Sequence, residues 1–253
     1  MKENKCKIEL EGKIPLINTC IDASLEISHP CKKPPKPEPV AEYKRIEMVL
    51  PKPPGVPPLP THIYFDMDTR LHENQVRASI ANLLSLWDDH YFEKAALGSS
   101  AWSRCAAKYS TKNLTPVWMD KERKSMITDG MKAFDFAMDT FTSFLIQNGT
   151  WNAPFARISY LPESSCSNMI GEVGNKQFHV PLDVKVNNRF LTSQSNLILA
   201  ASLFHAWMHR LGYKHTEGEY TGYLIAEAPM CAMRGYQDKV PGQPDSVFTR
   251  YFD

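Results

Sequence analysis

The sequence predicts an α+β fold, in which a small twisted sheet, mostly antiparallel or mixed, is backed by a long helix and followed by a histidine-bearing helix. Three observations support this class. Long segments repeat apolar residues every three or four positions, shorter segments alternate apolar and polar residues, and only a short tail follows the last helix. The chain has 253 residues, of which 43% are hydrophobic, so it can bury a sizeable core.

Residues 1–60 differ in composition from the rest of the chain. Eleven of the nineteen prolines fall between Pro30 and Pro60. Proline lacks an amide donor and fixes φ, which favours an extended, polyproline-like segment over a helix or a central strand. We therefore expect residues 1–60 to be a proline-rich arm or pro-segment and residues 61–253 to form the folded domain.

The folded domain begins with a short strand and two long helices. Residues 62–67 are rich in β-branched and aromatic side chains, which predicts a strand. Apolar residues at helical spacing predict helices over residues 74–90 and about 120–147. Residues 98–115 between them are expected to form a loop, with helical potential over 102–109.

Two further strands and a helix complete the pattern. Residues 155–161 alternate and predict a strand. Residues 176–186 predict another, and Pro181 within it favours an edge position because proline cannot donate to a strand ladder. Residues 193–211 predict a buried helix, with candidate N-caps at Thr192, Ser193 and Ser195.

This last helix carries two histidines at metal-ligand spacing. His205 and His209 are four residues apart, which places both imidazoles on one helix face, one turn apart. Gly212 follows, the residue type best able to end a helix in a left-handed conformation. His215 lies beyond this turn and could return beneath the helix as a third nitrogen ligand. Three imidazoles with one open position suit a catalytic zinc ion, Zn²⁺.

The run H-A-x-x-H-x-x-G-x-x-H resembles the signature of the metzincin zinc metallopeptidases, H-E-x-x-H-x-x-G-x-x-H. The resemblance implies a zincin-like fold and a zinc ion held by His205, His209 and His215, with Gly212 as a supporting residue. It also implies an edge strand before the active-site helix that pairs with an extended peptide, for which residues 176–186 are the candidate. The cofactor we expect is zinc, and the substrate a peptide or protein.

One fixed position departs from the family. Ala206 stands where metzincins have the glutamate that acts as general base, and alanine cannot accept a proton. We therefore expect a zinc endopeptidase that is inactive as written. Ala206 is either an engineered substitution, which we favour because all three ligands remain, or the mark of a natural pseudo-enzyme. The alternative function is a binding protein that captures an extended peptide without cleaving it.

Several downstream residues are candidates for the remaining roles that the resemblance implies. Met230 or Met233 could form the methionine turn beneath the zinc, and Pro229 favours a turn and therefore Met230. Glu227, eighteen residues after His209, is a rival third ligand. The candidates for a phenol that stabilises the oxyanion are Tyr220, Tyr223 and Tyr236.

The cysteines suggest a means of latency. The six cysteines are too few and too scattered for a small disulfide scaffold, and no C-x-x-C pair occurs. Cys31 lies in a proline-flanked stretch, and matrix metalloproteinases are kept latent by a pro-segment thiolate on the zinc. By this resemblance Cys31 is a candidate latency thiol, with Cys6 and Cys20 as alternatives.

Charge and hydropathy limit the partners. The net charge of +1 gives no electrostatic reason to expect nucleic acid, and no apolar run is long enough to span a membrane. The first ten residues are charged and lack the apolar core of a secretory signal. We expect a secreted or delivered effector or toxin, for which an immunity or inhibitor protein would be a further partner.

Overall fold

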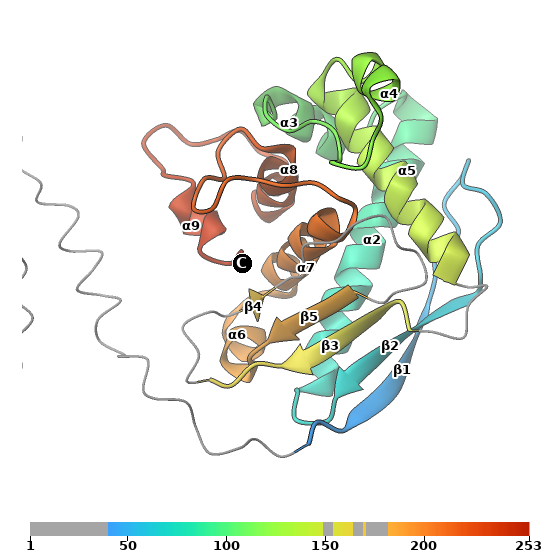
Figure 1. Cartoon of the computed structure of the whole chain (residues 1–253), viewed down its shortest axis with the longest axis vertical. Helices are drawn as coiled ribbons and strands as arrows, with labels where there is room; N and C mark the ends of the chain where they lie inside the picture. The colour runs from blue at the N-terminus through green and yellow to red at the C-terminus, as the bar shows by residue number, and fades with distance from the viewer. Residues whose placement is uncertain (1–39, 149–153, 164–168, 171–181, 253) are drawn as a thin grey trace, which may run out of the picture. The chain divides into compact units, whose positions relative to one another are not determined.

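The computed structural model of the chain describes residues 40–148, 154–163, 169–170 and 182–252 (Figure 1). Their fold is α+β, as predicted. The elements in chain order are β1 (Tyr43–Val49), β2 (His62–Asp68), α2 (Glu73–Leu97), α3 (Ala101–Tyr109), α4 (Lys121–Met126), α5 (Gly130–Asn148), β3 (Ala156–Tyr160), β4 (Met169–Ile170), β5 (Leu182–Val186), α6 (Asn188–Ser193), α7 (Asn196–Arg210), α8 (Leu224–Met233) and α9 (Ser246–Thr249). None of the described helices is long and apolar enough to cross a bilayer.

The described strands form one mixed sheet in the order β1-β2-β3-β5-β4. β2, β3 and β5 run parallel, and β1 and β4 pair antiparallel to their neighbours at the two edges. β5 therefore lies inside the sheet, so the prediction of an edge strand over residues 176–186 is wrong. Pro181, on which the edge assignment rested, directly precedes β5 in the sequence. Residues 171–181 lie outside the described part of the chain.

The arm predicted over residues 1–60 is shorter than expected. The compact unit is Pro39–Asp253, and β1 lies inside it, with Ile46 fully buried. Residues 40–50 contain no proline, which leaves seven consecutive amides free to pair in a strand. The boundary at residue 60 is therefore wrong. Cys6, Cys20 and Cys31 precede the described residues, so the latency hypothesis has no structural counterpart here.

The helix predicted over residues 120–147 is two helices. α4 ends at Met126, and the Asp129 side chain accepts a hydrogen bond from the Lys132 amide at 2.9 Å, which caps the start of α5. Met126, expected in the apolar face, is 69% exposed as a result. The helix predicted over residues 74–90 extends further, to Leu97, where Gly98 ends it in the left-handed conformation.

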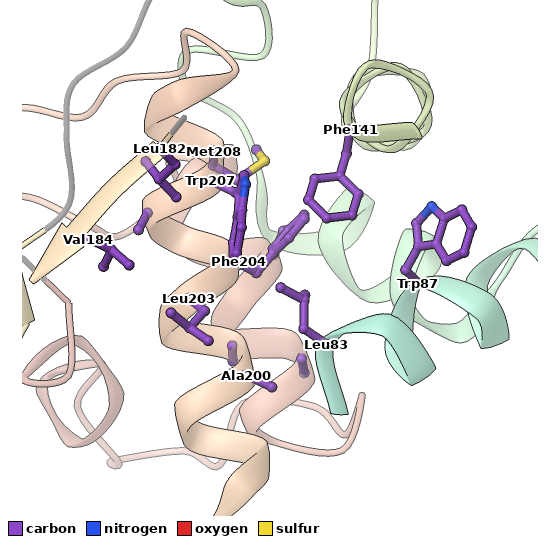
Figure 2. Packing of buried hydrophobic residues seen from close by; sticks show 14 of the residues in the cluster. Leu83, Trp87, Phe141, Leu182, Val184, Ala200, Leu203, Phe204, Trp207 and Met208 are labelled. Atoms are coloured by element: carbon purple, nitrogen blue, oxygen red, sulfur yellow. The ribbon is translucent and has the colours of Figure 1, made fainter. Parts of the chain in front are cut away.

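α7 runs through the centre of the fold, beside β5 and between α2 and α8 (Figure 1). Residues 199–210 are all buried. Phe204 and Trp207 lie between Phe141 of α5 and the side chains of β5 (Figure 2). The Trp207 ring stacks on Phe155 at 5.3 Å and meets Phe141 edge to face at 5.9 Å. Packing on every side holds α7 as a rigid base for its histidines.

Candidate metal centre

The three predicted histidines come together. One side-chain nitrogen from each of His205, His209 and His215 lies within 4.8 Å of the other two. His205 and His209 are buried on α7, with ring centroids 4.8 Å apart, and His215 is half-buried in the following loop. The residues are thus close enough to bind one metal ion.

The geometry and chemistry of the three side chains fit zinc. Two nitrogens bound to a tetrahedral zinc at about 2.0–2.1 Å would lie roughly 3.3 Å apart, so small side-chain rotations would complete the site. Three imidazoles without a carboxylate also suit a borderline-soft divalent ion better than calcium or magnesium. Among the described residues no acidic side chain joins the group.

His205 is fixed in the tautomer that a metal requires. Its Nδ1 lies 2.9 Å from the backbone carbonyl of Ile225 in α8. A carbonyl only accepts, so Nδ1 carries the proton and Nε2 carries the lone pair. Ligand histidines typically make this kind of bond with the nitrogen that does not face the metal.

The return of the chain to His215 depends on Gly212. This residue has φ 94°, and an added Cβ would lie 2.5 Å from Cδ1 of Trp118. The Gly212 amide donates to the His209 carbonyl at 2.9 Å, which closes the helix end. Both the left-handed conformation and the close ring therefore require glycine, as the motif implied.

The segment between α3 and α4 holds this loop in place. Trp118 Nε1 donates to the Leu211 carbonyl at 2.6 Å, and Asn113 Nδ2 donates to the Lys214 carbonyl at 2.9 Å. These bonds fix the backbone on both sides of the turn that leads to His215. Sequence reasoning missed this support, because nothing local in residues 111–119 signals contact with residues a hundred positions away.

The rival ligand Glu227 lies outside the histidine group. Its side chain is 1% exposed, and Oε1 accepts hydrogen bonds from the Gly222 amide at 2.9 Å and from Lys239 Nζ at 2.7 Å. Burial raises the pKa of this carboxyl, and the Lys239 ammonium opposes that rise. Lys239 also contacts Asp245 at 2.9 Å, so Glu227 ties α8 to the segment before α9.

Neither candidate methionine lies in a turn. Met230 and Met233 both belong to α8, which continues through Pro229, so the prediction of a tight turn is wrong. Met230 is fully buried in the core and Met233 is half-buried. Proline has no amide hydrogen to donate to the carbonyl four residues earlier, which is that of Ile225. The helix accommodates Pro229 because the Ile225 carbonyl has His205 as its partner instead.

Among the three candidate tyrosines, Tyr220 lies nearest the histidines. Its ring centroid is 4.7 Å from that of His215. The Tyr223 ring is further from His215, at 6.4 Å, and its hydroxyl bonds to Thr216. Tyr236 packs against Trp102, and burial raises its pKa. Tyr220 also borders a cavity of about 450 Å³, whose other lining residues include Lys112, Thr221 and Ser246.

Ala206 is fully buried on α7, directly after the first histidine. Ser202, one turn earlier, is also fully buried, and its hydroxyl has no hydrogen-bond partner within the described residues. Residues four apart on a helix are neighbours, so a longer polar side chain at position 206 would lie within reach of this hydroxyl.

A disulfide joins Cys105 of α3 to Cys231 of α8, with Cα atoms 5.9 Å apart. No spacing signal predicts this pair, since 126 positions separate the two cysteines. No protein-family model, curated protein or solved structure matches this chain.

Proposed function

We propose that this chain is a metzincin-like zinc endopeptidase that has lost its general base at position 206. In this form it binds zinc and cleaves peptides very poorly. The observation that carries the proposal is the convergence of His205, His209 and His215, from a helix and the loop that follows it, on one point.

The order of elements supports the zincin-like assignment. The described strands form a mixed sheet with β4 as an antiparallel edge strand beside β5, and the histidine-bearing helix α7 follows β5 after the short helix α6. This order agrees with the plan that the motif implies, with β4 in place of residues 176–186 as the edge strand available to an extended peptide.

The side chains of the site divide the roles of peptide hydrolysis. A bound zinc ion would polarise the scissile carbonyl and lower the pKa of a bound water toward about 7. His205, His209 and His215 would hold the ion, and Tyr220, whose ring lies 4.7 Å from that of His215, would donate a hydrogen bond to the developing oxyanion. The methyl group of Ala206 cannot take the proton from water, so this step lacks its acceptor.

The buried hydroxyl of Ser202 supports the interpretation that a polar side chain belongs at position 206. A buried hydroxyl without a partner costs free energy, and a glutamate one turn later would supply an acceptor. An engineered substitution and a natural pseudo-enzyme both fit the sequence, and the experiment below separates them.

A second candidate function is capture of a peptide without cleavage, which Ala206 itself favours. The cavity beside Tyr220 is large enough for a peptide side chain. The Cys105–Cys231 disulfide supports a protein that matures in an oxidising environment, as a secreted effector or toxin would.

The test combines metal content with reversal of Ala206. We expect about one zinc per chain by elemental analysis after dialysis against metal-free buffer. Ala206→Glu should gain chelator-sensitive cleavage of a diverse peptide library, by about 10²–10⁴-fold over the parent chain.

Ala206→Gln is the matched control, because it has the same shape without a basic carboxylate and should remain inactive. An Ala206→Glu variant that binds zinc and stays inert would favour the peptide-binding function. A parent chain that takes up no zinc would contradict the zinc endopeptidase and leave a metal-free peptide-binding protein.

A further inference from the structure

Two residues outside the histidine motif hold the ring of His205. One contacts an edge of the ring and the other covers a face of it. The ring edge is fixed by the bond from Nδ1 to the Ile225 carbonyl at 2.9 Å. The ring face is covered by Phe252, whose ring lies 4.2 Å away at an interplanar angle of 4°. The lone pair of Nε2 lies in the ring plane, so these two contacts set the direction in which His205 can bind a metal.

The edge contact depends on a proline. In an α-helix the carbonyl of residue 225 accepts a hydrogen bond from the amide of residue 229. Pro229 lies inside α8 and has no amide hydrogen, so it cannot compete with His205 for the Ile225 carbonyl. A proline in a helix interior is costly, and here it releases an acceptor that His205 uses.

The face contact is itself anchored. The ring before Phe252, Tyr251, stacks on Phe190 of α6 at 5.9 Å. Phe252 also meets Tyr220 at 5.7 Å, and Tyr220 meets His215 at 4.7 Å. A chain of rings therefore connects the ligand on α7 with the ligand in the loop.

We propose that Pro229 and Phe252 are positioning residues of the metal centre, which fix the ring of His205 through the Ile225 carbonyl and by direct stacking. This inference rests on the proposed zinc site. It gives Phe252, rather than Met230 or Met233, the task of supporting the ligands with an apolar side chain.

Cobalt(II) binding tests the proposal without any need for catalysis. The visible absorption of protein-bound Co²⁺ reports the geometry of its ligands. Relative to the parent chain, Phe252→Ala and Pro229→Ala should each bind Co²⁺ about 10–100-fold more weakly, the cost typical of lost support around metal ligands, with altered absorption bands.

Two comparisons separate positioning from packing. Phe252→Tyr keeps a flat ring and should restore affinity and spectrum, whereas Phe252→Leu, apolar but not flat, should restore them only in part. Pro229→Ala gives α8 an amide and a better helix former, so its thermal stability should not fall while its metal affinity does. Phe248→Ala, a half-buried ring on α9 with Arg234 above it, is the control and should bind Co²⁺ like the parent.

The failures are distinct. A parent chain that binds no Co²⁺ would overturn the metal centre and this inference together. A parent that binds Co²⁺, with unchanged affinity and spectrum in both Phe252→Ala and Pro229→Ala, would overturn the inference alone. Equal loss in Phe252→Ala and Phe248→Ala would also overturn it, and if Phe252→Ala does not fold, the Tyr and Leu variants decide.

Discussion

At the scale of single residues, the metal centre combines positions that the motif specifies with positions that it does not. Gly212 is a clear case of the first kind, because its positive φ and the nearby Trp118 ring each exclude a side chain. The spacing of Glu227 suggests a metal ligand, but its contacts show that it links two parts of the fold. Its Oε1 atom lies 2.7 Å from Lys239 Nζ, in an ion pair that links α8 to Lys239.

The choice between His215 and Glu227 as third ligand is a prediction at this scale. His215→Ala should lose zinc, because it removes one of the three clustered nitrogens, whereas Glu227→Gln should keep about one zinc per chain. Glu227→Gln should instead lower the free energy of unfolding by about 1–3 kcal/mol, because it weakens the charged hydrogen bond to Lys239, which keeps Asp245 as a partner.

Elemental analysis and urea denaturation of both variants measure these effects. The control is His72→Ala, which removes an exposed histidine outside the cluster and should change neither quantity. Zinc retained in His215→Ala and lost in Glu227→Gln would reverse the assignment.

The sequence was sufficient to predict that the three histidines cluster and insufficient to predict the residues that support them, for a physical reason. The three histidines lie within eleven residues, so helix periodicity and one glycine turn determine how they approach each other. Ile225 and Phe252 reach His205 through tertiary packing, which no local pattern encodes. Of these supporting residues, we singled out only Pro229 from the sequence. We predicted a turn there, whereas Pro229 lies inside the helix α8.

At the scale of elements, errors arose where a local signal was weaker than the pattern around it. The apolar spacing over residues 120–147 continued across Asp129-Gly130, although Asp129 is a good N-cap and begins a new helix. The prolines on both sides of β1 likewise led us to miss a proline-free strand that pairs with β2. The strands predicted over residues 62–67 and 155–161 came closest, since β2 and β3 differ from them by at most one residue at each end.

The disulfide between α3 and α8 leads to a prediction about these elements. It closes a long loop, with 126 residues of separation, and so restricts the unfolded chain strongly. Replacing both cysteines, Cys105→Ser with Cys231→Ser, should lower the free energy of unfolding by about 2–5 kcal/mol.

Denaturation with and without a thiol-free reductant provides the measurement and its control. The reductant should lower the stability of the parent chain to that of the double variant and should leave the double variant unchanged. A parent chain that shows both cysteines freely alkylated without reductant, and no loss of stability on reduction, would rule out the bond.

At the scale of the whole molecule, the pH dependence of stability depends on a histidine far from the motif. His90 in α2 is 1% exposed, and its Nδ1 lies 2.7 Å from the Ser100 hydroxyl. Burial, together with the nearby Lys94 ammonium, lowers the pKa of His90 from 6.5 to about 3. The folded protein thus keeps this ring neutral at pH values where the unfolded chain protonates it.

The sign of the effect follows from proton binding. Between pH 6.5 and about 3 the unfolded state holds one more proton at His90 than the folded state. Neutral His90 therefore makes its full contribution to the free energy of unfolding above pH 6.5. This contribution decreases by about 1.4 kcal/mol for each pH unit below that. Asp135, whose pKa is raised by burial, has the opposite effect on the pH dependence of stability.

Urea denaturation of the metal-free parent and of His90→Gln at about pH 7, 6 and 5 tests this prediction. Glutamine keeps a polar partner for Ser100 and does not titrate, and the other histidines contribute equally to both proteins. The parent should therefore lose about 1.4 kcal/mol more than the variant between pH 6 and 5. Parallel stability curves would mean that His90 is protonated in the folded protein, which requires water or a rearranged Asp135 beside its ring.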